Sequence, residues 1–191
     1  DALIFSGGAF SSVTSFDGGS GTDSLSFNGS SGTLAGGTVV NMESVSIGLG
    51  SNISVSGTLD TGTVTVIGTL GGSGLLNADV SVQAGGTLGP GNSPGLMTIV
   101  GNLDLDVSST TLIEIAGLTA GSQYDRIDVA DDPGTGATVE GIATLVAGAF
   151  FDIDFFGGFN GGLGDVGLGD FFDVLVADDI VGNVGTLNFN F

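Results

Sequence analysis

The sequence predicts an all-β fold, and three observations lead to that prediction. Apolar and polar residues alternate over many short segments, turns rich in Gly, Ser, Thr and Asn separate these segments, and one tripeptide recurs beside them. Alternation with a period of two places the apolar side chains of a strand on one face, which is typical of half-buried β-strands. Helices are not expected, because Gly and Thr are too frequent in every stretch.

The expected strands follow one another along the chain at residues 24–27, 45–47, 53–55, 64–66, 80–82, 103–107, 127–129 and 151–155. The tripeptide Gly-Thr-Leu lies beside expected strands at 32–34, 57–59, 68–70, 86–88 and 185–187. A small turn that recurs with a short strand is the mark of a β-solenoid, in which each coil buries its inward residues against the next. The alternative is a β-sandwich, which normally has longer strands and fewer glycines.

The length of 191 residues fits a single elongated solenoid domain with two unlike parts. Residues 1–100 are expected to form coils rich in Gly, Ser and Thr, whereas residues 101–191 form acidic coils that end in a Phe-rich cap. Four of the 13 Phe residues lie within 1–27 and the other nine within 150–191. Because large rings cover the most area per residue, we interpret both groups as caps over the open core. The alternative is that these ends contact other chains.

The composition excludes several classes of function. The chain contains 21 acidic residues and one basic residue, so its formal charge is −20, and it has no His, Cys or Trp. It cannot build the cationic stripe that nucleic acids or anionic membrane surfaces require. Catalysis by His, Cys or Lys, disulfides and Cys/His zinc sites are likewise excluded. No apolar run approaches the ~18 residues of a membrane helix, so membrane insertion is not expected.

A candidate calcium site lies near the start of the chain. Residues 18–26 fit the nonapeptide G-G-x-G-x-D-x-U-x that binds calcium in repeat proteins, with Asp23 at the acidic position and Asp17 nearby. Carboxylates and exposed carbonyls are the hard oxygen ligands that calcium prefers. Such sites take ligands from two successive turns, however, and the sequence has one copy. We expect no cofactor, with calcium at Asp17 and Asp23 as the alternative to a purely structural glycine turn.

The acidic residues raise the alternative of an enzyme that acts on polysaccharides. The pairs Asp104/Asp106 and Asp152/Asp154 fall on one face of a strand, and two well-placed carboxylates suffice for glycoside hydrolysis. Such an enzyme would also use basic residues to bind acidic sugars, and the chain has one, Arg126. This residue lies between Asp125 and Asp128 and is expected to form an ion pair. We therefore expect no enzymatic activity, and we interpret the acids as a solvated face that keeps the protein soluble.

The two ends of the chain carry no charge, in contrast to the middle. Residues 2–16 and 180–191 are free of charged side chains, and the last segment alternates strictly. Uncharged edge strands recruit other strands. We expect copies of the chain to associate head to tail through Leu3, Ile4, Phe5, Phe10, Leu187, Phe189 and Phe191. The alternatives are that both ends fold back over their own coils, or that the chain is a processed piece of a longer protein.

Two segments resemble a known family. Residues 86–95 read Gly-Thr-Leu-Gly-Pro-Gly-Asn-Ser-Pro-Gly, and residues 124–129 read Tyr-Asp-Arg-Ile-Asp-Val. They resemble the G-T-L-x-P-G-N-S-P-G and Y-D-x-[LI]-x-V elements of autotransporter-associated β-strand repeat proteins. The resemblance implies a right-handed β-helix that is displayed on a bacterial cell surface or released outside the cell. It also implies an adhesive or structural role without catalytic residues.

We therefore expect a non-enzymatic extracellular structural protein, a β-solenoid subunit that assembles with itself into a filament, sheath or surface layer. The alternative is a monomeric adhesin that binds glycans or a host surface, and a polysaccharide-active enzyme is the weakest hypothesis. Removing residues 187–191, or the substitution Phe189→Asp, should leave a folded monomer if the ends assemble.

Overall fold

The computed structural model describes residues 1–11, 13, 15–35, 38–91, 94–130, 141–159 and 170–190. Its 18 strands belong to one sheet, and every pair of named strands is parallel. Within the described ranges the chain forms no helix, so no helix there is long and apolar enough to cross a membrane.

The strands form three stacks that wrap around a common core, and the chain visits the stacks in turn. The first stack contains β1 (Ala2–Ala9), β3 (Ser24–Leu34), β4 (Thr38–Ile47), β6 (Thr58–Val66), β8 (Leu75–Val82), β11 (Leu103–Leu105), β14 (Ile142–Leu145) and β17 (Asp179–Gly182). The second contains the end of β3, then β5 (Asn52–Val55), β7 (Thr69–Gly72), β9 (Thr87–Pro90), β12 (Thr110–Ile115), β15 (Phe150–Phe155) and β18 (Thr186–Asn190).

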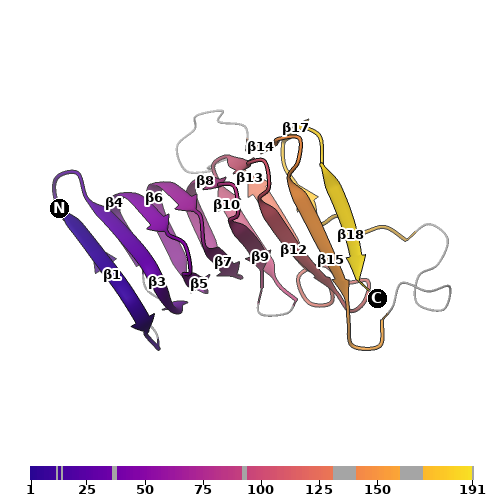
Figure 1. Cartoon of the computed structure of the whole chain (residues 1–191), viewed down its shortest axis with the longest axis horizontal. Helices are drawn as coiled ribbons and strands as arrows, with labels where there is room; N and C mark the ends of the chain where they lie inside the picture. Colours follow the sequence, from indigo (N-terminus) through magenta and orange to yellow (C-terminus); the bar gives the residue numbers. More distant parts are fainter. Residues whose placement is uncertain are drawn as a thin grey trace.

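The third stack contains β2 (Phe16–Asp17), the starts of β4, β6 and β8, then β10 (Leu96–Val100), β13 (Arg126–Ala130) and β16 (Leu175–Val176). Figure 1 shows the coils following one another along the long axis, with β1 at one end and β18 at the other. The predicted β-solenoid is confirmed. A β-sandwich, the alternative, is excluded because its sheets are antiparallel.

Columns of inward side chains build the core. In the first stack one column contains Leu25, Val45, Val64, Val80, Leu103 and Ala143, each at most 1% exposed. The residues between these inward positions point to solvent, as the alternation predicted. Full burial of one such side chain contributes about 1.5–3 kcal/mol, and each coil adds several of them.

Two kinds of strand boundary differ from the prediction. β3, β4, β6 and β8 are longer than expected because the chain keeps its ladder with the coil below while it turns a corner, with register shifts in β4 and β6. The strand expected at 103–107 ends at Leu105 instead. Asp106 Oδ1 accepts the Val107 N–H at 2.7 Å, and Ser108 has a positive φ of 61°, so a turn begins there.

Candidate functional site

The first coil of the solenoid is filled by a layer of aromatic rings, one from each stack. Phe5 comes from β1, Phe10 follows that strand, and Phe16 belongs to β2. The Phe5 ring centroid lies 5.8 Å from that of Phe10 and 5.5 Å from that of Phe16, and it stacks on buried Phe27 at 5.4 Å. The three rings are partly buried and cover the core of the second coil. They form the aromatic cap that the sequence predicted for this end.

Leu3 and Ile4, both predicted to act in self-assembly, point in opposite directions. Leu3 is in register with fully buried Leu25 and therefore belongs to an inward column, whereas Ile4 is in register with Ser26 in an outward column. Both side chains are exposed, Leu3 because no further coil covers it in the described chain. The sequence placed them in one set, and the register separates them.

The other end exposes inward columns in the same way. Leu187 and Phe189 of β18 are in register with Phe151 and Ile153 of β15, and Ile180 of β17 is in register with buried Ala143. All three are about half exposed. A hollow of about 250 Å³ opens beside Ile180 and Leu187, and it is lined by Leu145, Phe151, Phe172, Asp173, Val174, Leu175, Ile180, Val184 and Leu187. Phe191, the remaining residue of the predicted set, lies outside the described residues.

A second aromatic group lies beside this hollow. The Phe172 ring packs edge to face on Tyr124, with centroids 5.2 Å apart, and also contacts Phe159. Tyr124 is buried, and Phe171 points to solvent. The sequence placed the predicted C-terminal cap in this region.

The terminal strands also leave backbone edges facing outward. In the part of the chain that the structure describes, the ladder of β1 joins β3, that of β17 joins β14, and that of β18 joins β15. An interior strand such as β6 instead pairs on both sides, with β4 and with β8. Each end of the solenoid therefore presents backbone donors and acceptors together with exposed apolar side chains.

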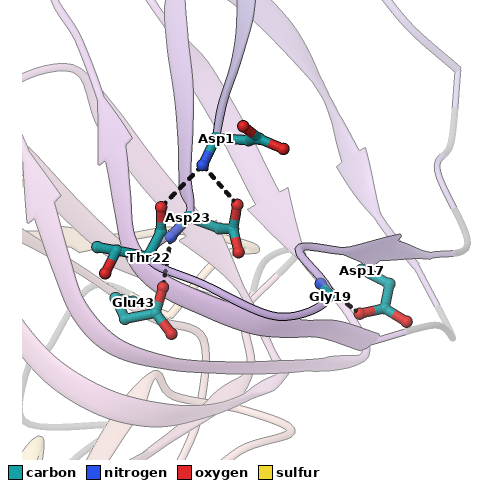
Figure 2. A network of polar contacts seen from close by, with 6 residues as sticks. All are labelled: Asp1, Asp17, Gly19, Thr22, Asp23 and Glu43. Atoms are coloured by element: carbon teal, nitrogen blue, oxygen red, sulfur yellow. Dashed lines mark hydrogen bonds and ion pairs between the residues drawn. The ribbon is translucent and has the colours of Figure 1, made fainter.

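The candidate calcium residues, Asp17 and Asp23, line one hollow of about 280 Å³ at the start of the solenoid. Figure 2 shows that they belong to separate networks. Asp17 Oδ1 accepts the Gly19 N–H at 3.0 Å and the Asn41 amide at 2.8 Å, and these hydrogen bonds, that from Asn41 first, lower the pKa of Asp17. Asp23 Oδ1 accepts a hydrogen bond from the amino group of Asp1 at 2.7 Å, and the Asp23 N–H donates to the Glu43 carboxylate.

The glycines of this turn have structural roles of their own. A Cβ at Gly18 would come within 1.9 Å of the Asn41 carbonyl oxygen, and Gly19 has a φ of +81°, in the region that favours glycine. Among the described residues no group of three Asp, Glu, His or Cys side chains is arranged to hold a metal ion. Calcium at Asp17 and Asp23 stays the untested alternative to a purely structural glycine turn.

Among the described acidic residues of the second half, all except Asp125 are exposed or half-buried. Asp152 and Asp154 occupy outward positions of β15 that alternate with buried Phe151 and Ile153. Arg126 forms the predicted ion pair, with its Nε donating to Asp128 Oδ1. Asp125 is 1% exposed, and its two carboxylate oxygens accept the N–H groups of Gly95 at 2.7 Å and Glu114 at 2.9 Å. It thereby ties the turn before β10 to β12 of the next coil.

Ile180 and Val181 are end residues that were not predicted from the sequence. The signal was available, because both lie in the uncharged segment 180–191, but only the strand register shows that they lie on the terminal coil.

Comparison of the chain with protein-family models finds no match, and comparison with curated proteins finds none either.

Proposed function

We propose that this chain is a non-enzymatic structural subunit that assembles end to end with copies of itself into an extracellular filament, sheath or surface layer. The observation that carries the proposal is that both ends of the solenoid expose members of the inward columns. Leu3 at one end and Ile180 and Leu187 at the other belong to columns whose interior members are buried. Stacking one copy on the next buries these side chains and continues the backbone ladder.

Apolar burial and backbone hydrogen bonding both favour association at the ends. Each half-exposed Leu or Ile that becomes buried contributes about 1 kcal/mol, half of the usual value for a whole side chain. Each ladder hydrogen bond adds about 0.5–1.5 kcal/mol. On the outer face of the first stack, residues such as Ser26, Ser46 and Thr65 are polar, so contact with that face buries little apolar area.

An extracellular location at a bacterial surface belongs to the same proposal. It is supported by the resemblance of residues 86–95 and 124–129 to autotransporter-associated β-strand repeats, because that family is displayed or released outside the cell. The adhesin alternative would use exposed aromatic residues away from the ends. Tyr124, the aromatic residue between 28 and 149, is buried, so the described residues favour assembly.

Electron microscopy and analytical ultracentrifugation of the 191-residue chain test the proposal. We expect filaments or larger ordered assemblies of the parent chain and a folded monomer for Leu187→Asp. A matched control is Leu118→Asp, because Leu118 is 48% exposed, close to the 52% of Leu187, but lies between β12 and β13, away from the terminal coils. Deleting 187–191 should act like Leu187→Asp. Assembly that survives both changes at the end would overturn the proposal.

A further inference from the structure

The outward column of the first stack changes character at its two ends. The registers of successive strands align Ile4, Ser26, Ser46, Thr65, Ser81, Asp104, Thr144 and Val181. The inner members are all polar, whereas the end members, Ile4 and Val181, are β-branched and apolar, and they are 60% and 47% exposed. An outward apolar side chain is buried only if another surface covers it. Ile4 and Val181 have matching chemistry at matching positions of opposite ends.

The inward columns of the same stack end in complementary shapes. Leu3 begins the column that Ile180 ends, and Phe5 begins the column that Gly182 ends. Gly182 has no side chain, and the hollow of about 250 Å³ lies at this end of the core. The aromatic layer at the start of the solenoid thus has a counterpart at the other end, where the core is left partly unfilled.

The second stack has the same register at both ends. A Cβ at Gly32 would meet the Phe10 ring, so Phe10 lies in the inward column that continues through Ile53, Leu70, Leu88, Thr111 and Phe151 to Leu187. Leu3 and Phe10 are seven positions apart in the sequence, and so are Ile180 and Leu187. One placement of a second copy therefore aligns Leu3 with Ile180 and Phe10 with Leu187 at once.

We propose that copies join with β17 of one copy parallel to β1 of the next, in the register that sets Val181 beside Ile4 and Ile180 beside Leu3. In the second stack, Leu187 of the first copy then lies beside Phe10 of the next. This inference rests on the proposed function and adds the register of the junction. The two contacting surfaces differ and the junction continues the solenoid axis, so the assembly is an open filament.

Disulfide trapping tests the register, because the chain has no native cysteine. Neighbouring strands lie about 4.7–4.9 Å apart, within the range of Cα separations that a disulfide bridges. The variant Ile4→Cys/Val181→Cys is assembled under reducing conditions, oxidised and run on a denaturing gel. We expect a ladder of covalent multimers. A bond within one copy is excluded, because β1 and β17 lie toward opposite ends of the solenoid (Figure 1).

The matched control is Ile4→Cys/Ile180→Cys, which shifts the pair by one residue onto opposite faces. We expect it to yield about tenfold fewer covalent multimers, because Cβ atoms that point to opposite faces cannot be bridged without backbone movement. The inner pair Leu3→Cys/Ile180→Cys should cross-link like the first variant. The register would be overturned if the variants assemble under reducing conditions but the control, or Ile4→Cys alone, cross-links as much as or more than Ile4→Cys/Val181→Cys. That result would leave the proposed function standing. Absence of assembly by ultracentrifugation for the parent chain and every variant would overturn both.

Discussion

The ring of Phe10 lies directly against the α-carbon of Gly32. A Cβ at Gly32 would come within 2.4 Å of two carbons of that ring, and the Phe10 N–H donates to the carbonyl of Ser31 at 2.9 Å. The first coil therefore accommodates a large ring because the second coil has no side chain at that point. The Phe10 ring thus fills the space that a side chain at Gly32 would occupy in the column that the two residues share.

The substitution Gly32→Ala tests this relationship. We expect the free energy of unfolding to fall by about 1–3 kcal/mol, because the added methyl group overpacks the column. Chemical denaturation followed by circular dichroism measures the change. Gly89→Ala is the control, since a Cβ there meets only Leu112 at 3.8 Å, and it should stay within about 0.5 kcal/mol of the parent. In a Phe10→Ala background, Gly32→Ala should lower the free energy of unfolding far less. Strictly additive changes in the free energy of unfolding would contradict the interpretation.

The buried carboxylate of Asp125 predicts a pH-dependent stability. Burial raises its pKa to about 6, above the ordinary value near 4, although the N–H groups of Glu114 and Gly95 act in the opposite direction and the Glu114 charge adds to the rise. Between these two pKa values the folded chain binds a proton that the unfolded chain does not. This group's contribution to the free energy of unfolding therefore increases as the pH falls from above 6 toward 4.

Comparison of the parent chain with Asp125→Asn isolates that contribution. At pH 7 the variant should be less stable by about 1–3 kcal/mol, because the Asn amide cannot accept both backbone N–H groups. The advantage of the parent should widen as the pH falls toward 4.5, when measured by urea denaturation at each pH. Asp104→Asn removes an exposed charge from β11 and serves as the control. An advantage that narrows with falling pH would contradict the assignment.

The glycine turn at residues 18–21 predicts indifference to calcium. Gly18 and Gly19 have steric reasons to be glycine, and the Asp17 carboxylate already accepts two hydrogen bonds. We expect the same melting temperature in excess calcium and in excess EDTA, measured by thermal denaturation. A calcium-dependent rise of several degrees that Asp23→Asn abolishes would instead establish the site that the nonapeptide suggested.

Salt should strengthen the end-to-end assembly. Each copy has a formal charge of −20, whereas residues 2–16 and 180–191 are uncharged, so the junction gains no ion pairs while the bodies repel. Raising the ionic strength shortens the Debye length to about 8 Å at physiological salt and screens this repulsion. Sedimentation at several salt concentrations should show larger assemblies as salt increases. Dissociation by salt would indicate a junction held by charge instead.

Much of the fold could be predicted from local pattern. The alternation of Val64, Thr65 and Val66 identifies a strand and its inward face, and both are found in β6. The position of phenylalanine at the ends also anticipated the layer of Phe5, Phe10 and Phe16. These features follow from residue type and spacing along one short segment, which the sequence displays directly.

The alignment of one coil on the next could not be predicted, because coil length varies. Val64 pairs with Val80, whereas Leu103 pairs with Ala143, so no fixed period gives the register. For that reason the end position of Val181 became visible only in the structure. The opposite directions of Leu3 and Ile4 were missed because residues 2–5 are all apolar, so no alternation marks a strand there. The hydrogen bond between the Asp125 carboxylate and the Gly95 N–H was missed for a related reason, because the two residues lie 30 positions apart in the sequence.

The direction of the backbone ladder has a mechanical consequence. Hydrogen bonds between successive coils run along the long axis of the solenoid, and each coil bonds only to its neighbours. Tension applied at the two ends is carried by these contacts in series, so the coils detach one after another and are not all sheared together. Each released coil adds up to about 3.3–3.6 Å of contour length per residue. A fibre of such subunits would lengthen stepwise under load and dissipate energy before it breaks.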